Sequence, residues 1–237
     1  MGRGPSIEGR KNAEDAKRAK VFTKLIREIT VAARGGGDPA TNPRLRIAVD
    51  KALSANMTKD TVERAVKRGS GAEGADNMQE IRYEGYGPGG VALIIDTMTD
   101  NLVRTVADVR HALSKHGGNL GTSGSVAFQF KHLGEIRVST PDAAAEERLM
   151  ELALEAGADD VQSADGESLV LCDYASFEAV KKALTDAGLP VLSADVVMRP
   201  DNRVAVADED ARETLLDLID WLEGLDDVQE VYHNAAL

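Results

Sequence analysis

The N-terminal part of the chain repeats apolar residues at the three- and four-residue spacing of amphipathic helices. One stripe ends at the glycines of 35–37, and a second begins after Asn42 and Pro43. A third follows Thr58 and stops at Gly69. Because Asn and Thr are good N-caps and proline suits the first helical position, the pattern predicts three short helices in a small bundle. The expected apolar positions are Phe22, Leu25, Ile26, Ile29, Ala33, Leu45, Ala48, Val49, Ala52, Leu53, Val62, Ala65 and Val66.

The apolar period then changes to two, which is typical of β-strands. The change follows residues 69–77, a polar and glycine-rich segment that reads as a linker. Strands are predicted at 80–86, 90–98 and 124–130. A helix is predicted over 101–118, between the second and the third of these strands.

The C-terminal half of the chain contains a unit that is complete in itself. Residues 135–199 follow the order strand, helix, strand, strand, helix, strand, the βαββαβ pattern of ferredoxin-like domains. A last helix at 208–225 and strand at 228–235 are too small to fold alone and would complete the sheet begun at 80–130. The sequence therefore predicts an α+β fold of three domains. They are a basic helical domain at 1–77, a discontinuous α/β domain at 78–133 plus 200–237, and an inserted ferredoxin-like α/β domain at 134–199.

The glycine-rich stretch YEGYGPGG at 83–90 raises the possibility of a phosphate-binding loop. A dinucleotide-binding loop leads into a helix, whose N-terminal amides hold the pyrophosphate. Here VALIIDTMT follows, which is rich in β-branched residues, and no lysine of the P-loop type is present. The stretch is therefore predicted to be a tight connection between two strands, with glycines at positive φ.

Side chains that could carry catalysis or bind a metal do not form a recognisable pattern. His111 and His116 are five residues apart on a predicted helix, which places them on different faces, and His132 and His233 have no ligand-spaced partner. Cys172, the single cysteine, lies in an alternating strand and is interpreted as a half-buried structural thiol. No catalytic residue, metal ligand or cofactor is assigned, and an enzyme is not expected.

Around the helix predicted at 101–118, polar residues have two interpretations. Asp100 or Asn101 is a natural N-cap, and Arg104, Arg110 and His116 would then form surface contacts. Alternatively, these side chains form a partner surface beside the glycine turn. The capping interpretation is favoured.

Composition favours a globular protein of the cytoplasm. The chain has 237 residues, 43% hydrophobic but only 4% aromatic, which suits an aliphatic α/β core. The longest apolar runs, such as VALII, are far shorter than a membrane span of about 20 residues. The N-terminus lacks the apolar region of a secretory signal, so neither a membrane nor secretion is expected. The oligomeric state is left open, a monomer included.

Charge is divided unevenly along the chain. The net charge is −12, but residues 1–78 carry 16 Lys and Arg against 10 Asp and Glu. Residues 79–237 carry the remaining 12 basic and 30 acidic side chains. This asymmetry points to one basic face for a polyanion on an otherwise acidic body. Two ordinary solvated surfaces are the alternative interpretation.

Two clusters of cations are the candidates for that face. Within the first, Lys17, Lys20, Lys24 and Arg27 recur at helical spacing beside the apolar stripe and could follow a row of phosphates. The second cluster consists of Lys59, Arg64, Lys67 and Arg68. Both clusters could instead be solvated surfaces, and Lys67 and Arg68 also suit a helix C-terminus. No element that reads bases is evident. The candidate nucleic-acid-binding residues are Arg10, Lys11, Lys17, Arg18, Lys20, Lys24, Arg27, Lys59, Arg64, Lys67 and Arg68.

Two long segments resemble the YebC/PmpR family of bacterial proteins. The first is DAKRAKVFTKLIREITVAARGGGDPATNPRLRIAVDKALSANMTKDTVERAVKRG at 15–69. The second is IRYEGYGPGGVALIIDTMTDNLVRTVADVRHALSKHGGNLGTSGSVAFQF at 81–130. The resemblance implies three domains with the third inserted in the second, no enzymatic activity, and a cytoplasmic location. It also implies two different functions, since members are described as DNA-binding transcriptional regulators whereas relatives, mitochondrial ones included, act in translation at the ribosome, on ribosomal RNA and proline-rich stretches.

The extreme N-terminus departs from the family pattern. Gly4 stands where the family commonly has Trp, and Glu8 where it has Lys. The loss of an aromatic side chain weakens any base-stacking role for this tail. The positions that still match are Arg10, Lys11, Asp15, Lys17, Arg18 and Lys20.

Overall fold

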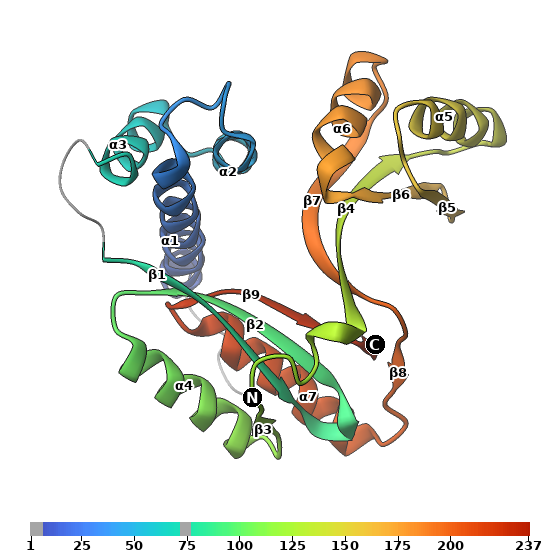
Figure 1. Ribbon diagram of the computed structural model, residues 1–237. Coiled ribbons are helices and arrows are strands. Elements are labelled where there is room, and N and C mark those ends of the chain that lie inside the picture. Colours follow the sequence, from blue (N-terminus) through green and yellow to red (C-terminus); the bar gives the residue numbers. More distant parts are fainter. Residues whose placement is uncertain (1–6, 72–76) are drawn as a thin grey trace. The chain divides into compact units, whose positions relative to one another are not determined.

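The computed structural model describes residues 7–71 and 77–237, with side chains from Lys11 onward (Figure 1). The chain forms two compact units, each with buried apolar side chains of its own. Unit 1 consists of Met1–Arg82, Ile95–Ala112 and Asp217–Val231, and unit 2 of Tyr83–Ile94, Leu113–Leu216 and Tyr232–Leu237.

Helices and strands alternate after an all-helical start. The α-helices are α1 (Ile7–Ala32), α2 (Pro43–Ser54), α3 (Lys59–Gly69), α4 (Leu102–Lys115), α5 (Ala143–Glu155), α6 (Phe177–Asp186) and α7 (Glu209–Gly224). The strands are β1 (Gln79–Tyr86), β2 (Ala92–Thr99), β3 (Asn119–Leu120), β4 (Phe130–Ser139), β5 (Asp160–Ala164), β6 (Glu167–Asp173), β7 (Val191–Pro200), β8 (Val204–Ala205), β9 (Val228–His233) and β10 (Ala235–Ala236). The α+β fold class is thereby confirmed.

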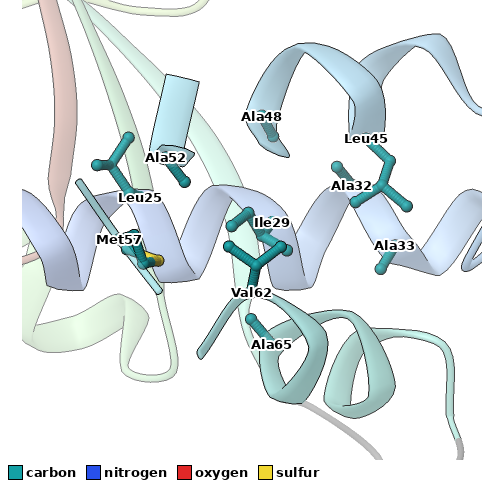
Figure 2. Close-up of a cluster of buried hydrophobic side chains, with 10 residues drawn as sticks. All are labelled: Leu25, Ile29, Ala32, Ala33, Leu45, Ala48, Ala52, Met57, Val62 and Ala65. Atoms are coloured by element: carbon teal, nitrogen blue, oxygen red, sulfur yellow. The ribbon is translucent and has the colours of Figure 1, made fainter. Parts of the chain in front are cut away.

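The three predicted N-terminal helices form, and their caps are those that the sequence indicates. The Asn42 side chain accepts a hydrogen bond from the Leu45 amide, and Pro43 occupies the first turn of α2. Thr58 caps α3 in the same way, and that helix ends at Gly69. Figure 2 shows the core that α1, α2 and α3 share, which consists of Leu25, Ile29, Ala32, Ala33, Leu45, Ala48, Ala52, Met57, Val62 and Ala65.

The end of α3 lies directly against the backbone of α1. A Cβ atom added at Gly69 would lie 1.9 Å from the Thr30 carbonyl oxygen and 2.9 Å from the Ala33 Cβ. Only a residue without a side chain can therefore occupy this helix crossing.

Unit 2 contains the predicted βαββαβ series. Its four strands form an antiparallel sheet in the order β5-β6-β4-β7, and α5 and α6 pack beside each other on it (Figure 1). β4 begins at Phe130, so it extends across position 134, where the inserted domain was predicted to start. The three-domain division itself stays a prediction.

The second four-stranded sheet has the order β3-β1-β2-β9. β1 and β2 each contribute residues to both units. β9, from the C-terminal end of the chain, extends this sheet beyond β2, as the sequence predicted.

The prediction of a strand at 124–130 is wrong. Residues 127–129 form a 3₁₀ turn instead, and only Phe130 belongs to a strand. The physical reason is Glu84, which is 4% exposed and lies on β1. Its carboxylate accepts hydrogen bonds from the amides of Gly124 (2.6 Å), Val126 (3.0 Å) and Ala127 (2.6 Å). Amides bound to this carboxylate are not available to a sheet.

The glycine-rich stretch is a connection between β1 and β2, as predicted. Gly89 and Gly90 have φ values of 74° and 73°, which side-chain-bearing residues rarely adopt. The Gly87 amide donates to the Val91 carbonyl across the turn, at 2.8 Å. No helix follows the turn, so the geometry of a dinucleotide-binding loop is absent from this stretch.

Cys172 is more deeply buried than the half-buried position predicted for it. It is fully inaccessible in β6, and this burial raises the pKa of its thiol to about 11. Across the described ranges, no helix is both long and apolar enough to cross a membrane.

Candidate nucleic-acid interface

The first turns of α1 present cations to solvent. Lys11, Lys17 and Arg18 are all exposed. Neither lysine forms a hydrogen bond or an ion pair with a residue that the structure describes. The Arg18 guanidinium lies over the Phe22 ring, 5.2 Å from its centroid, and stays exposed. Arg10 lies in α1, but its side chain is outside the described part. Lys11, Lys17 and Arg18 are therefore accessible to phosphates.

The second half of the basic row has a different environment. The Lys20 ammonium donates to the Gly224 carbonyl at 2.9 Å, and the Lys24 ammonium to the Glu223 carbonyl at 2.6 Å. Arg27 donates to the carbonyls of Asp226 (2.7 Å) and Met98 (3.1 Å) and to the Asp227 carboxylate (3.2 Å). Burial lowers the pKa of Lys24, although neighbouring carboxylates oppose this shift. Lys20 and Lys24 therefore face the last carbonyls of α7, and Arg27 faces the segment that directly follows α7.

The end of α7 attracts cations for a reason that lies in its sequence. The last carbonyls of any helix have no partner within the helix, and they carry its partial negative charge. α7 has no basic residue in its last turn. Lys20 and Lys24 of α1 supply the missing donors.

Asp227 is the centre of a hydrogen-bond network beside these carbonyls. It is 5% exposed, and its carboxylate accepts from Arg27, Arg104 and Thr105. The two Arg104 contacts measure 3.0 and 2.9 Å, and the Thr105 contact 2.9 Å. Burial alone would raise the pKa of Asp227, but the hydrogen bonds from its partners, first from Arg104, outweigh burial and lower it.

Sequence reasoning missed this network, although one signal was present. Glu223, Asp226 and Asp227 place three negative charges at a helix C-terminus, where the helix dipole disfavours them. Such a cluster requires cations from elsewhere in the fold. The capping interpretation of α4 was correct, because Asn101 accepts a hydrogen bond from the Arg104 amide at 3.0 Å.

The cations of α3 differ in their surroundings. Lys59 and Lys67 line a groove of about 390 Å³ between α2 and α3, whose apolar walls include Val49, Leu53 and Val66. Arg64 and Arg68 are exposed and do not line this groove. Arg64 forms an ion pair with Asp60, one turn earlier, at 2.9 Å. All four cations are exposed, and Arg64, Lys67 and Arg68 recur at three- and four-residue spacing on α3.

The histidines stay apart. His111 lies 6.2 Å from the Trp221 ring, and His132 is stacked on Tyr174 at 4.8 Å. In the ranges that the structure describes, no three His, Cys, Asp or Glu side chains group as metal ligands would.

Comparisons with known proteins cover nearly the whole chain. Residues 4–72 match the profile of the TACO1/YebC protein N-terminal domain, and residues 78–235 that of the TACO1/YebC second and third domain. The boundary between these two matches falls in the segment that the sequence predicts to be a linker.

Similar curated proteins share one description. A "Probable transcriptional regulatory protein" of Xanthomonas oryzae pv. oryzae (strain MAFF 311018) is 58% identical, covering 99% of this chain and 97% of that protein. One of the same description from Stenotrophomonas maltophilia (strain K279a) is 59% identical over 100% of this chain and 98% of its own.

A solved structure confirms the fold. The crystal structure of a conserved hypothetical protein, Aq1575, from Aquifex aeolicus superposes with a TM-score of 0.83. It is 43% identical, and the match covers 94% of this chain and 91% of that chain. The chain therefore belongs to the TACO1/YebC family, because it matches the profiles of all three family domains, full-length relatives and a shared fold.

Proposed function

We propose that this protein is a non-enzymatic regulator of gene expression that acts in the cytoplasm by binding nucleic acid, with DNA as its target. The observation that carries the proposal is the exposed set Lys11, Lys17 and Arg18 at the start of α1. The description of the relatives as transcriptional regulatory proteins supports it.

The contact is expected to follow phosphates rather than read bases. Lysine and arginine that project from the outside of a helix neutralise phosphates and release counterions, whatever the base sequence. Arg64, Lys67 and Arg68 of α3 are exposed and would extend the contact. Arg27 is excluded from it while its guanidinium is bound to Asp227.

The same chemistry favours a second candidate, a ribosome-associated translation factor that binds ribosomal RNA and relieves stalling on proline-rich stretches. Cations without a base-reading element fit an RNA helix as well as a DNA duplex, because RNA helices are recognised mainly by shape and phosphates. The relatives' description favours DNA.

A triple charge reversal tests the polyanion contact. The variant Lys11→Glu/Lys17→Glu/Arg18→Glu removes three exposed cations that have no ion pair among the described residues. We expect its affinity for a short DNA duplex to fall by at least about tenfold, and the slope of log affinity against log salt to become shallower by about three. Fluorescence anisotropy of a labelled duplex across a salt series measures both quantities.

The matched control makes the same change of charge elsewhere. Arg110, Arg137 and Arg212 are also exposed and have no side-chain partner among the described residues. Their replacement by Glu leaves the proposed contact intact, so binding should stay near that of the wild type. Equal losses in the two variants would contradict a local interface and indicate a general effect of net charge.

A further inference from the structure

The α1 face that contains Lys20, Lys24 and Arg27 is already occupied by oxygen atoms of the same chain. Five contacts between 2.6 and 3.2 Å join these cations to four carbonyls and one carboxylate. The Gln229 side chain adds a hydrogen bond to the Lys24 carbonyl, at 2.9 Å. The contact therefore involves the backbone of α1 as well as its side chains.

This row of oxygens has the properties of a phosphate row. The carbonyls of Glu223 and Gly224 carry the partial negative charge of a helix C-terminus, and Asp227 adds a full charge next to them. Lysine and arginine donate to such oxygens as they do to phosphate. A polyanion that lies along α1 would need the same donors.

We infer that the end of α7 is an internal ligand of the basic row, and that a polyanion and α7 exclude each other at Lys20, Lys24 and Arg27. This inference rests on the proposed function. In the free protein the polyanion first meets Lys11, Lys17 and Arg18. It can bind Lys20, Lys24 and Arg27 only when α1 separates from α7. Polyanion binding therefore weakens the α1–α7 contact, and this contact weakens polyanion binding.

The contacts that a polyanion would have to displace from Lys20, Lys24 and Arg27 differ in strength. The hydrogen bonds from the exposed Lys20 and the half-buried Lys24 to neutral carbonyls each contribute little, because these groups exchange one hydrogen-bond partner for water. Arg27 is held more firmly, because Asp227 is buried and also bound by Arg104. Asp227 therefore sets how easily α7 is displaced.

A pair of single substitutions tests this coupling. Asp227→Asn removes the charge that holds Arg27, whereas Asp226→Asn removes an equal charge from an exposed side chain next to it. We expect Asp227→Asn to bind the DNA duplex about fivefold or more tightly than Asp226→Asn. Equal affinities of the two folded variants would overturn the inference.

A cross-link provides a second test that leaves all the candidate cations in place. Lys51 on α2 and Glu230 on β9 form an ion pair of 3.7 Å in unit 1. The variant Lys51→Cys/Glu230→Cys can be joined by a short bismaleimide, while the buried Cys172 does not react. We expect the cross-linked variant (the joined form) to bind the duplex more weakly than the same variant without the cross-link (the open form). The slope of its log affinity against log salt should be shallower by about two to three.

The single tryptophan reports the release directly. Trp221 lies in the last turn of α7 and is 39% exposed. Its emission should change on duplex binding in the open form and stay constant in the joined form. Identical affinity, slope and emission in both forms would overturn the inference but leave the proposed function intact. Failure of both forms to bind the duplex would instead contradict the proposed function.

Discussion

At Asp227 a single carboxylate joins three segments of unit 1. Arg27 reaches it from α1, and Arg104 and Thr105 reach it from α4. Asp100 shares Arg104 with it, through a contact of 3.0 Å. Donors that bind the charged carboxylate favour that form, and they lower the pKa of Asp227 although burial opposes this. The stability of these contacts must therefore depend on pH.

Acid should weaken unit 1 through this residue. A carboxyl group whose pKa is lowered by folding stabilises the folded state fully above its unfolded pKa of about 3.9, and this contribution disappears as the pH falls through the lower folded value. We expect Asp227→Asn to lower the free energy of unfolding by about 2 kcal/mol at pH 7. The difference from the wild type should shrink below about pH 4. Urea unfolding followed by Trp221 fluorescence measures it.

The exposed neighbour is again the control. Asp226→Asn should leave the unfolding free energy close to that of the wild type at both pH values, because its side chain is exposed. A loss for Asp227→Asn that is as large at pH 3 as at pH 7 would mean that packing, rather than charge, holds this site.

At the scale of elements, local signals predicted the helices well and one strand wrongly. The caps Asn42 and Thr58 are visible in sequence because a capping side chain acts within three residues. The segment 124–130 has a strand-like pattern, but the Glu84 carboxylate binds amides of this segment. Glu84 precedes Gly124, the first of these residues, by 40 positions. A contact between distant residues leaves no local pattern, so the sequence could not reveal it.

Helix packing in the bundle depends on one glycine. Gly69→Ala would place a methyl group 1.9 Å from the Thr30 carbonyl oxygen, so α3 must move away from α1. We expect a loss of about 3 kcal/mol in unfolding free energy, measured by urea denaturation with circular dichroism. Gly224→Ala is the matched control, since its methyl group would meet nothing within 4 Å. If the two variants were equally stable, the close crossing of α1 and α3 would be refuted.

At the scale of the whole molecule, the acidic excess of residues 79–237 limits what the basic N-terminal part can bind. Acidic side chains repel phosphates within about 10 Å, so a duplex that covers only the N-terminal helices meets less repulsion than a surface that also covers the acidic residues. We expect the tagged protein to stay out of the ribosomal fractions of a sucrose gradient after DNase treatment. Ribosome association that survives DNase would instead favour the translation alternative.

The sequence predicted which residues are cationic and helical, but it could not predict which of them are free. Lys17 and Lys24 occupy the same stripe of one helix, and only the fold shows that Lys24 binds the Glu223 carbonyl. Backbone carbonyls have no sequence signature, because every residue has one. The missing half of the candidate site was therefore beyond sequence reasoning, apart from the acidic cluster at the end of α7.

The Glu84 carboxylate has one more consequence. Three backbone amides that converge on a single anion are the arrangement by which loops elsewhere capture phosphate. Here the protein fills that nest with its own side chain, from within the very stretch whose glycines suggested a phosphate loop. Because Glu84 already binds these three amides, the loop does not offer them to an external anion such as sulfate.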